Sequence, residues 1–187
     1  LEIKGGTIEG NDKGSAILAW NGSNTTISGG KITSKLGTIS DPICAIKIAN
    51  DNEDISKNPG SLTINGGEIT SSGLNTIQNN YSNTTIKKGN IGNTYTGDGI
   101  AHTVENNGGK LIIDGGVITG STKGSKVYAS SKSTTTISNG KIINTAYLDD
   151  SAICAVKVYN ENKDKTKNPA YLLSLIHISE PTRHLRI

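Results

Sequence analysis

A chain of 187 residues with 23 glycines, no phenylalanine or methionine and a single tryptophan lacks the side chains that usually fill a globular core. Its formal net charge of +3 arises from 19 basic and 16 acidic residues without a basic cluster, which argues against a nucleic-acid partner. The sequence contains no apolar run of about 18 residues, so we expect no membrane insertion.

One motif, L-x-I-x-G-G-x-I, recurs along the chain with leucine and threonine alternating at its first position. The six copies start at Leu1, Thr25, Leu62, Thr84, Leu111 and Thr135, and successive starts are 24, 37, 22, 27 and 24 residues apart. Such spacings are typical of the coils of a solenoid. Within each copy, apolar and polar residues alternate, which predicts a strand with one buried face.

The motif predicts one interior row of isoleucines and one set of tight bends. The expected row is Ile3, Ile27, Ile64, Ile86, Ile113 and Ile137. The glycines that follow permit a positive φ or a close backbone approach. The predicted corner residues are Gly5, Gly6, Gly29, Gly30, Gly66, Gly67, Gly89, Gly115, Gly116 and Gly140.

A further strand is expected in each coil, as in the stretch Cys44–Ala49, with Cys44, Ile46 and Ile48 inward and Ala45, Lys47 and Ala49 outward. Its counterparts are Ile17/Ala19, His102/Val104 and Cys154/Val156/Val158. Each ends at an asparagine suited to a left-handed turn: Asn21, Asn50, Asn106 and Asn160, with Asn79 or Asn80 in the third coil. We expect these side chains to form a hydrogen-bonded ladder.

A longer repeat contains these coils. Residues 1–62 align without gaps with residues 111–172, and 29 of the 62 positions are identical. Four coils therefore form one higher-order unit, and we expect an all-β solenoid of about six coils of 22–37 residues over residues 1–172.

The segments "LTINGGEIT" and "LIIDGGVIT" resemble the repeats of adhesin-like bacterial surface proteins with a right-handed parallel β-helix of the pectin-lyase-like type. The resemblance covers residues 1–172 and implies a fragment of a secreted or cell-wall protein with an adhesive, structural or glycan-binding role. Its partner would be a carbohydrate or another host or cell-surface ligand. Because the superfamily also contains enzymes, the alternative is a non-catalytic part of a polysaccharide lyase or glycoside hydrolase.

The last residues depart from the repeat. A glycine corner should follow Leu172, but the register stops at Leu173, and "LSLIHISEPTR" resembles an in-frame translation of a transposon sequencing adaptor. We therefore expect residues 173–187 to be non-native and to pack poorly, the alternative being a genuine C-terminal cap. We therefore assign no functional role to these residues.

Catalysis and metal binding find little support in the repeat. Glycoside hydrolysis needs two carboxyl groups about 5–9 Å apart, and the expected outward columns of neighbouring coils hold no two acids. Asp149-Asp150 is an isolated acidic pair, and the run from Asp51 to Asp54 favours a solvated loop over a calcium site. We predict no enzymatic activity, no metal and no cofactor.

Cysteine, histidine and aromatic residues provide the remaining hypotheses. Cys44 and Cys154 lie four coils apart, roughly 19 Å, which favours buried free thiols over a disulfide. His102 occupies the position of Ile46, so we expect a buried neutral imidazole rather than a catalytic one. Trp20, Tyr128 and Tyr159 lie outward or at turns and are the candidate glycan contacts, although they belong to different coils.

Overall fold

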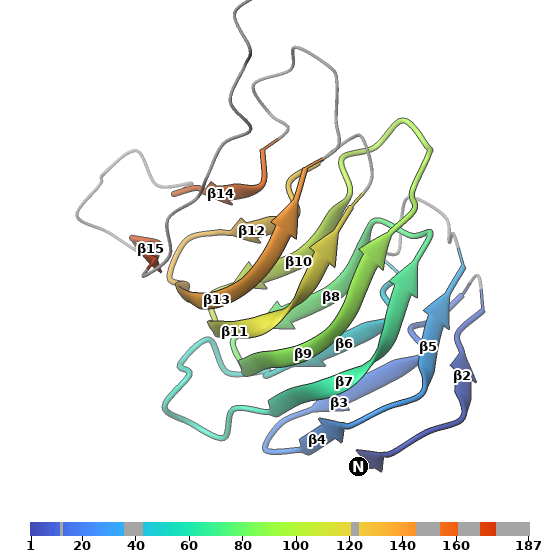
Figure 1. The fold of residues 1–187 in the computed structure, drawn as a ribbon. Coiled ribbons are helices and arrows are strands. Elements are labelled where there is room, and N and C mark those ends of the chain that lie inside the picture. Colours follow the sequence, from blue (N-terminus) through green and yellow to red (C-terminus); the bar gives the residue numbers. More distant parts are fainter. Residues whose placement is uncertain (12, 36–42, 121–123, 145–153, 161–168, 175–187) are drawn as a thin grey trace, which may run out of the picture.

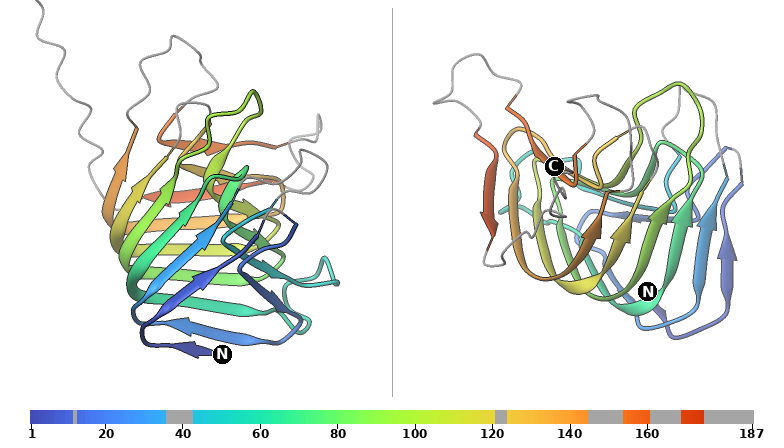
Figure 2. Two further views of the ribbon diagram at one scale, coloured as in Figure 1. Left: turned by 90° about the vertical axis from the view of Figure 1, so that its right-hand side faces the viewer. Right: turned by 45° about the horizontal axis from the view of Figure 1, so that its top comes forward.

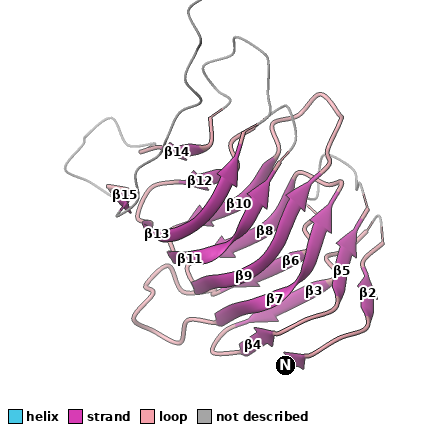
Figure 3. Cartoon of the chain, viewed as in Figure 1, coloured by secondary structure: helices cyan, strands magenta, loops and turns pink. Residues whose placement is uncertain are grey.

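The computed structural model describes residues 1–11, 13–35, 43–120, 124–144, 154–160 and 169–174. Every regular element in these ranges is a β-strand, as Figure 3 shows. The predicted all-β class is therefore confirmed. Since this part of the chain forms no helix, it offers none long and apolar enough to cross a membrane.

Nine strands form a parallel sheet along one side of the molecule. They are β1 (Glu2–Ile3), β2 (Thr7–Glu9), β4 (Asn24–Ile27), β5 (Lys31–Ser34), β7 (Ser61–Ser71), β9 (Asn83–Asn93), β11 (Lys110–Thr119), β13 (Thr134–Ile143) and β15 (Tyr171–Ser174). The order is β1-β4-β7-β9-β11-β13-β15, and β5 joins β2 to β7.

The remaining six described strands form a second parallel sheet behind the first (Figure 1). They are β3 (Ile17–Trp20), β6 (Ile46–Ala49), β8 (Asn75–Asn80), β10 (His102–Asn107), β12 (Val127–Ala129) and β14 (Val156–Val158). In both sheets each strand pairs with the strand of the next repeat, and the views in Figure 2 show these strands stacked as successive rungs. The arrangement is consistent with a parallel β-solenoid.

The core consists of rows of aliphatic side chains between the two sheets. Strand pairing aligns the six isoleucines of the predicted row with one another: Ile3, Ile27, Ile64, Ile86, Ile113 and Ile137. All six are at least 94% buried, so the predicted interior row is confirmed. A second aligned row consists of Ile8, Ile32, Ile69, Ile91, Ile118 and Ile142.

The glycine motif fills two structural roles. The second glycine adopts a left-handed φ, for example +94° at Gly67. The first lies against the preceding rung, and a Cβ at Gly66 would be 2.7 Å from the carbonyl oxygen of Ser28. In β7, β9, β11 and β13 these glycines lie inside one long strand, whereas in the first two repeats they separate β1 from β2 and β4 from β5.

The asparagine predictions are confirmed only in part. Asn21 has a positive φ of 27°, but the equivalent turn positions are filled by Tyr81 and Gly108, with φ values of 49° and 65°. Asn106 lies instead within β10, where it is fully buried and its Oδ1 accepts a hydrogen bond from Asn79 Nδ2 at 2.8 Å. The asparagine ladder thus exists between these two residues, in the core rather than in the turns.

Two alanines expected to face outward are buried. Ala45 is inaccessible to solvent, and Ala49 is only 3% exposed. Ala49 pairs with Trp20 on one side and with Asn80 on the other. Its methyl group is covered because it lies between longer side chains. Ala45 instead packs within the hydrophobic core, so its predicted outward position is wrong.

The strand pairing repeats with the same offset of 110 residues that the sequence shows. Leu18 pairs with Lys47 in the first unit, and Tyr128 pairs with Lys157 in the second. At the C-terminal end, β15 extends two residues beyond Leu172, pairing Leu173 with Thr136. Leu173 is 56% exposed, and the rest of the expected tail, residues 175–187, lies outside the described residues.

Candidate functional site

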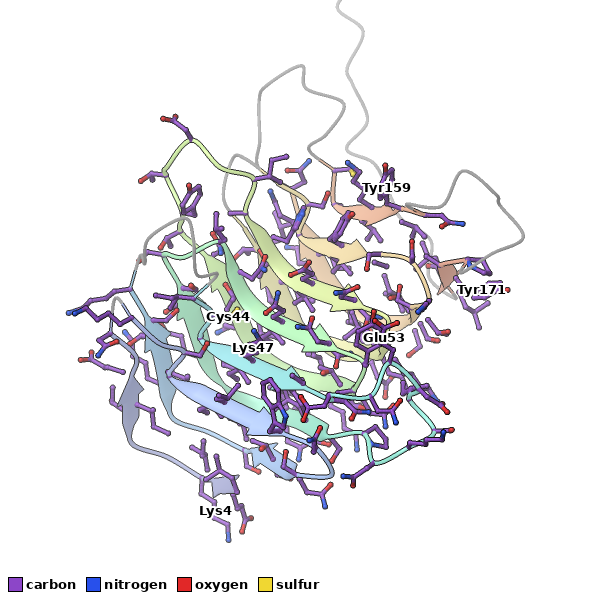
Figure 4. The ribbon with its side chains drawn as sticks, turned by 180° about the vertical axis from the view of Figure 1, so that it is seen from behind. Lys4, Cys44, Lys47, Glu53, Tyr159 and Tyr171 are labelled. Carbon is purple, nitrogen blue, oxygen red and sulfur yellow. The ribbon has the colours of Figure 1, made fainter. Side chains whose placement is uncertain are left out.

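The outer face of the six-stranded sheet carries a row of charged, amide and aromatic side chains. Its central column, which we call the outer row, follows the pairing of all six strands: Leu18, Lys47, Gln78, Glu105, Tyr128 and Lys157. Neighbouring members of such a row lie about 4.8 Å apart. Figure 4 views this face directly, with Lys47 on β6 and Tyr159 at the far end of the sheet.

Glu105 forms the polar centre of the outer row. Its Oε2 accepts hydrogen bonds from Asn75 Nδ2 at 2.6 Å and from Gln78 Nε2 at 2.9 Å. Both amide side chains are more than 90% buried, so the carboxylate is held in a fixed orientation at the surface of β8 and β10. Charge-assisted hydrogen bonds of this kind are stronger than neutral ones, which makes the arrangement rigid.

His102 lies beside this carboxylate and contradicts the register expected for it. His102 pairs with Asn75. Ile46 pairs with Ile77, which in turn pairs with Val104, so Val104 occupies the position equivalent to Ile46. Its ring stacks on Tyr128 with centroids 4.4 Å apart and an interplanar angle of 4°. The predicted equivalence of His102 with Ile46 is therefore wrong, because the strand is displaced by two residues.

The neutral state expected for His102 has a clear physical basis. Burial lowers the pKa of the imidazole from 6.5 to about 4, against a smaller opposite effect of the hydrogen bond with the Ser125 backbone. The N–H of Ser125 donates to His102 Nδ1 at 3.2 Å, which fixes the ring between β10 and β12. The imidazole is therefore neutral at physiological pH.

This pKa leads to a pH prediction. The unfolded imidazole takes up a proton below about pH 6.5, but the folded one does so only near pH 4, so stability should fall as the pH decreases through this window. NMR titration of the His102 ring protons should give a midpoint near 4. A His102→Gln variant should lose this part of the pH dependence, whereas a midpoint near 6.5 would contradict the buried geometry.

The sheet brings together two of the three predicted aromatic contacts. Tyr128 lies on β12, and Tyr159 follows β14 on the neighbouring rung, with Lys157 Nζ 5.8 Å from the centre of the Tyr159 ring. Trp20 lies on β3 at the opposite edge, five strands away, or roughly 24 Å. The indole N–H of Trp20 and the amide of Asn21 hold the pKa of Asp51 below its usual range.

Cys44 and Cys154 are thiols rather than a disulfide, and their burial differs. Cys44 is inaccessible to solvent, and burial raises the pKa of its thiol to about 12, so it remains protonated. Cys154 is only partly buried, with its Sγ 3.4 Å from Ser125 Oγ. The expectation of two buried thiols therefore holds for Cys44 and is wrong in part for Cys154, which lies at the start of the last rung of this sheet.

Several described carboxylates pair with protein donors. In the nine-stranded sheet, Glu68 lies between its strand-pairing partners Lys31 and Asn90. In the six-stranded sheet, Glu105 lies between its partners Gln78 and Tyr128. In the loop expected to be solvated, Glu53 forms an ion pair with Lys132 Nζ at 2.6 Å. The part of the chain that the structure describes holds no group of three His, Cys, Asp or Glu side chains arranged for a metal, and Asp149-Asp150 lies outside it.

Sequence reasoning missed the polar centre around Glu105. Asn75, Gln78 and Glu105 belong to residues 63–110, which have no second copy in the chain, so their relative register could not be read from internal alignment. Comparisons of the chain with protein-family models, with curated proteins and with solved structures found no match.

Proposed function

We propose that this chain is a section of a right-handed parallel β-helix of about six coils, bent at its glycine motifs, from a secreted or cell-surface bacterial protein. We further propose that it binds glycans on the outer face of the six-stranded sheet. Its role is adhesive and structural rather than catalytic.

One observation carries the binding proposal: two tyrosines lie on neighbouring rungs beside a fixed carboxylate. Tyr128 and Tyr159 offer apolar ring surface for the C–H faces of a sugar, and Tyr159 is 47% exposed. Lys157 and Glu105 supply a donor and an acceptor for hydroxyl groups in the same row. Because these residues lie on hydrogen-bonded strands, their spacing is set by the backbone rather than by loops.

The test measures binding of the full chain to immobilised glycans. We expect the double change Tyr128→Ala/Tyr159→Ala to weaken binding at least about tenfold, which corresponds to about 1.4 kcal/mol. Trp20→Ala is the matched control, since its ring lies at the other edge of the same face and should have little effect. Binding unaffected by the double change, or the absence of any bound glycan, would contradict the proposal.

A further inference from the structure

A glycine interrupts a column of threonines on the outer face of the nine-stranded sheet. Strand pairing aligns Thr33, Thr70, Gly92 and Thr119 in this order. Gly92 has no left-handed φ, so the backbone of β9 does not require glycine there. A Cβ at this position would meet Thr119 Oγ1 at 3.3 Å and Thr70 Cγ2 at 3.6 Å, contacts that a small side-chain adjustment accommodates.

Glycine inside a strand weakens it, and often marks a place where a ligand approaches the backbone closely. Here Gly92 lies in the lining of a surface hollow of about 300 Å³. The hollow is lined by Glu68, Thr70, Asn90, Ile91, Gly92, Val117 and Thr119, from β7, β9 and β11, which lie side by side in Figure 1.

The backbone around this hollow is anchored from inside the molecule. The buried hydroxyl of Thr76 donates to the carbonyl oxygen of Gly92 at 2.8 Å, and that of Thr103 donates to the carbonyl oxygen of Thr119 at 2.7 Å. Both threonines are inaccessible to solvent and belong to the six-stranded sheet. The hollow is therefore a pre-formed feature of three stacked rungs rather than a gap between mobile loops.

The lining has the chemistry of a sugar subsite. Glu68 and Asn90 offer a carboxylate and an amide, Thr70 and Thr119 offer hydroxyls, and Val117 supplies an apolar wall. The charge of Glu68 is balanced by Lys31 Nζ, 3.6 Å from its Oε1. With no aromatic ring in the lining, the hollow does not suit a stacked base, and its balanced charge suits an uncharged, hydroxyl-rich ring.

We infer that the hollow at Gly92 is a second glycan subsite, which takes one neutral hexopyranose unit against β9. The inference rests on the proposed glycan-binding role for its ligand class but concerns the opposite sheet. Gly92 acts as a specificity-determining residue, since any side chain there would occupy the space of the sugar ring.

The test uses the full chain and three probes: the methyl pyranosides of glucose, galactose and mannose. At least one should shift the backbone amide signals of Gly92, Val117 and Thr119 in NMR titrations, saturating at millimolar concentration. Gly92→Thr continues the threonine column, so its melting temperature should equal or exceed that of the wild type while the shifts disappear. Asn90→Ala, a surface change, should weaken the same shifts without filling the hollow.

The two proposed sites can be separated by the same spectra. The Tyr128→Ala/Tyr159→Ala variant should keep the Gly92 shifts, and Gly92→Thr should keep binding at the tyrosines. Wild-type signals at the hollow that respond to none of the three sugars would overturn this inference. Sugar-induced shifts that persist in a folded Gly92→Thr variant would overturn it as well. Neither result would contradict the proposed binding site at Tyr128 and Tyr159.

Discussion

Replacing Ile86 by alanine should destabilise the protein by about 3 kcal/mol. Ile86 is inaccessible to solvent and pairs with Ile64 and Ile113 in the central part of the interior row. Removing most of its side chain costs the transfer free energy of the lost groups and leaves a cavity, because hydrogen-bonded rungs on both sides prevent collapse. Urea unfolding followed by circular dichroism measures the loss.

Thr85→Ala is the matched control, since Thr85 directly precedes Ile86 in β9 and points to the outer face. We expect it to change the free energy of unfolding by less than about 1 kcal/mol. Equal effects of the two changes would mean that the inward and outward faces of β9 are wrongly assigned.

Gly115→Ala should have an effect of similar size or larger, more than about 3 kcal/mol, for a different reason. A Cβ at Gly115 would clash with the carbonyl oxygen of Lys87 on the preceding rung. Since the carbonyl oxygen belongs to the backbone and the Cβ has no rotamer freedom, relief requires β11 to move away from β9, which breaks the pairing of Val117 with Asn90. Thermal unfolding of the purified variant measures the effect.

Gly5 provides the control that the internal repeat makes available. It is the equivalent of Gly115 at the offset of 110 residues, but a Cβ at Gly5 would meet nothing within 4 Å. We expect Gly5→Ala to be neutral within about 0.5 kcal/mol. If both alanine variants were tolerated alike, the close stacking of rungs at the glycine motif would be refuted.

The parts of the fold predicted correctly are those with a strict repeat. The predicted isoleucine row follows from the period of two and from the six copies of the motif, and every copy constrains the others. His102 was misplaced because the period of two fixes which residues share a face but not which of two equivalent registers a strand adopts. Residues 63–110 occur once, so no second copy resolved that choice.

The candidate site was predictable to a smaller extent for the same reason. Tyr128 and Tyr159 were recognised as outward residues, but their proximity depends on the pairing of β12 with β14. The hollow at Gly92 depends on the absence of a side chain, and a glycine in a glycine-rich sequence carries no distinctive signal. Only its alignment with Thr70 and Thr119 reveals it.

Distances between spin labels test the stacking of rungs most directly. One label at Glu2 and a second at Thr85, Ile112 or Thr136 would sample three, four and five strand steps along the column aligned by pairing. Labels introduced as unnatural amino acids leave Cys44 and Cys154 unchanged. The stacked structure predicts that the mean distance increases by about 4.8 Å from each site to the next. Distances that fail to increase in equal steps would contradict the parallel stack, and with it both proposed glycan sites.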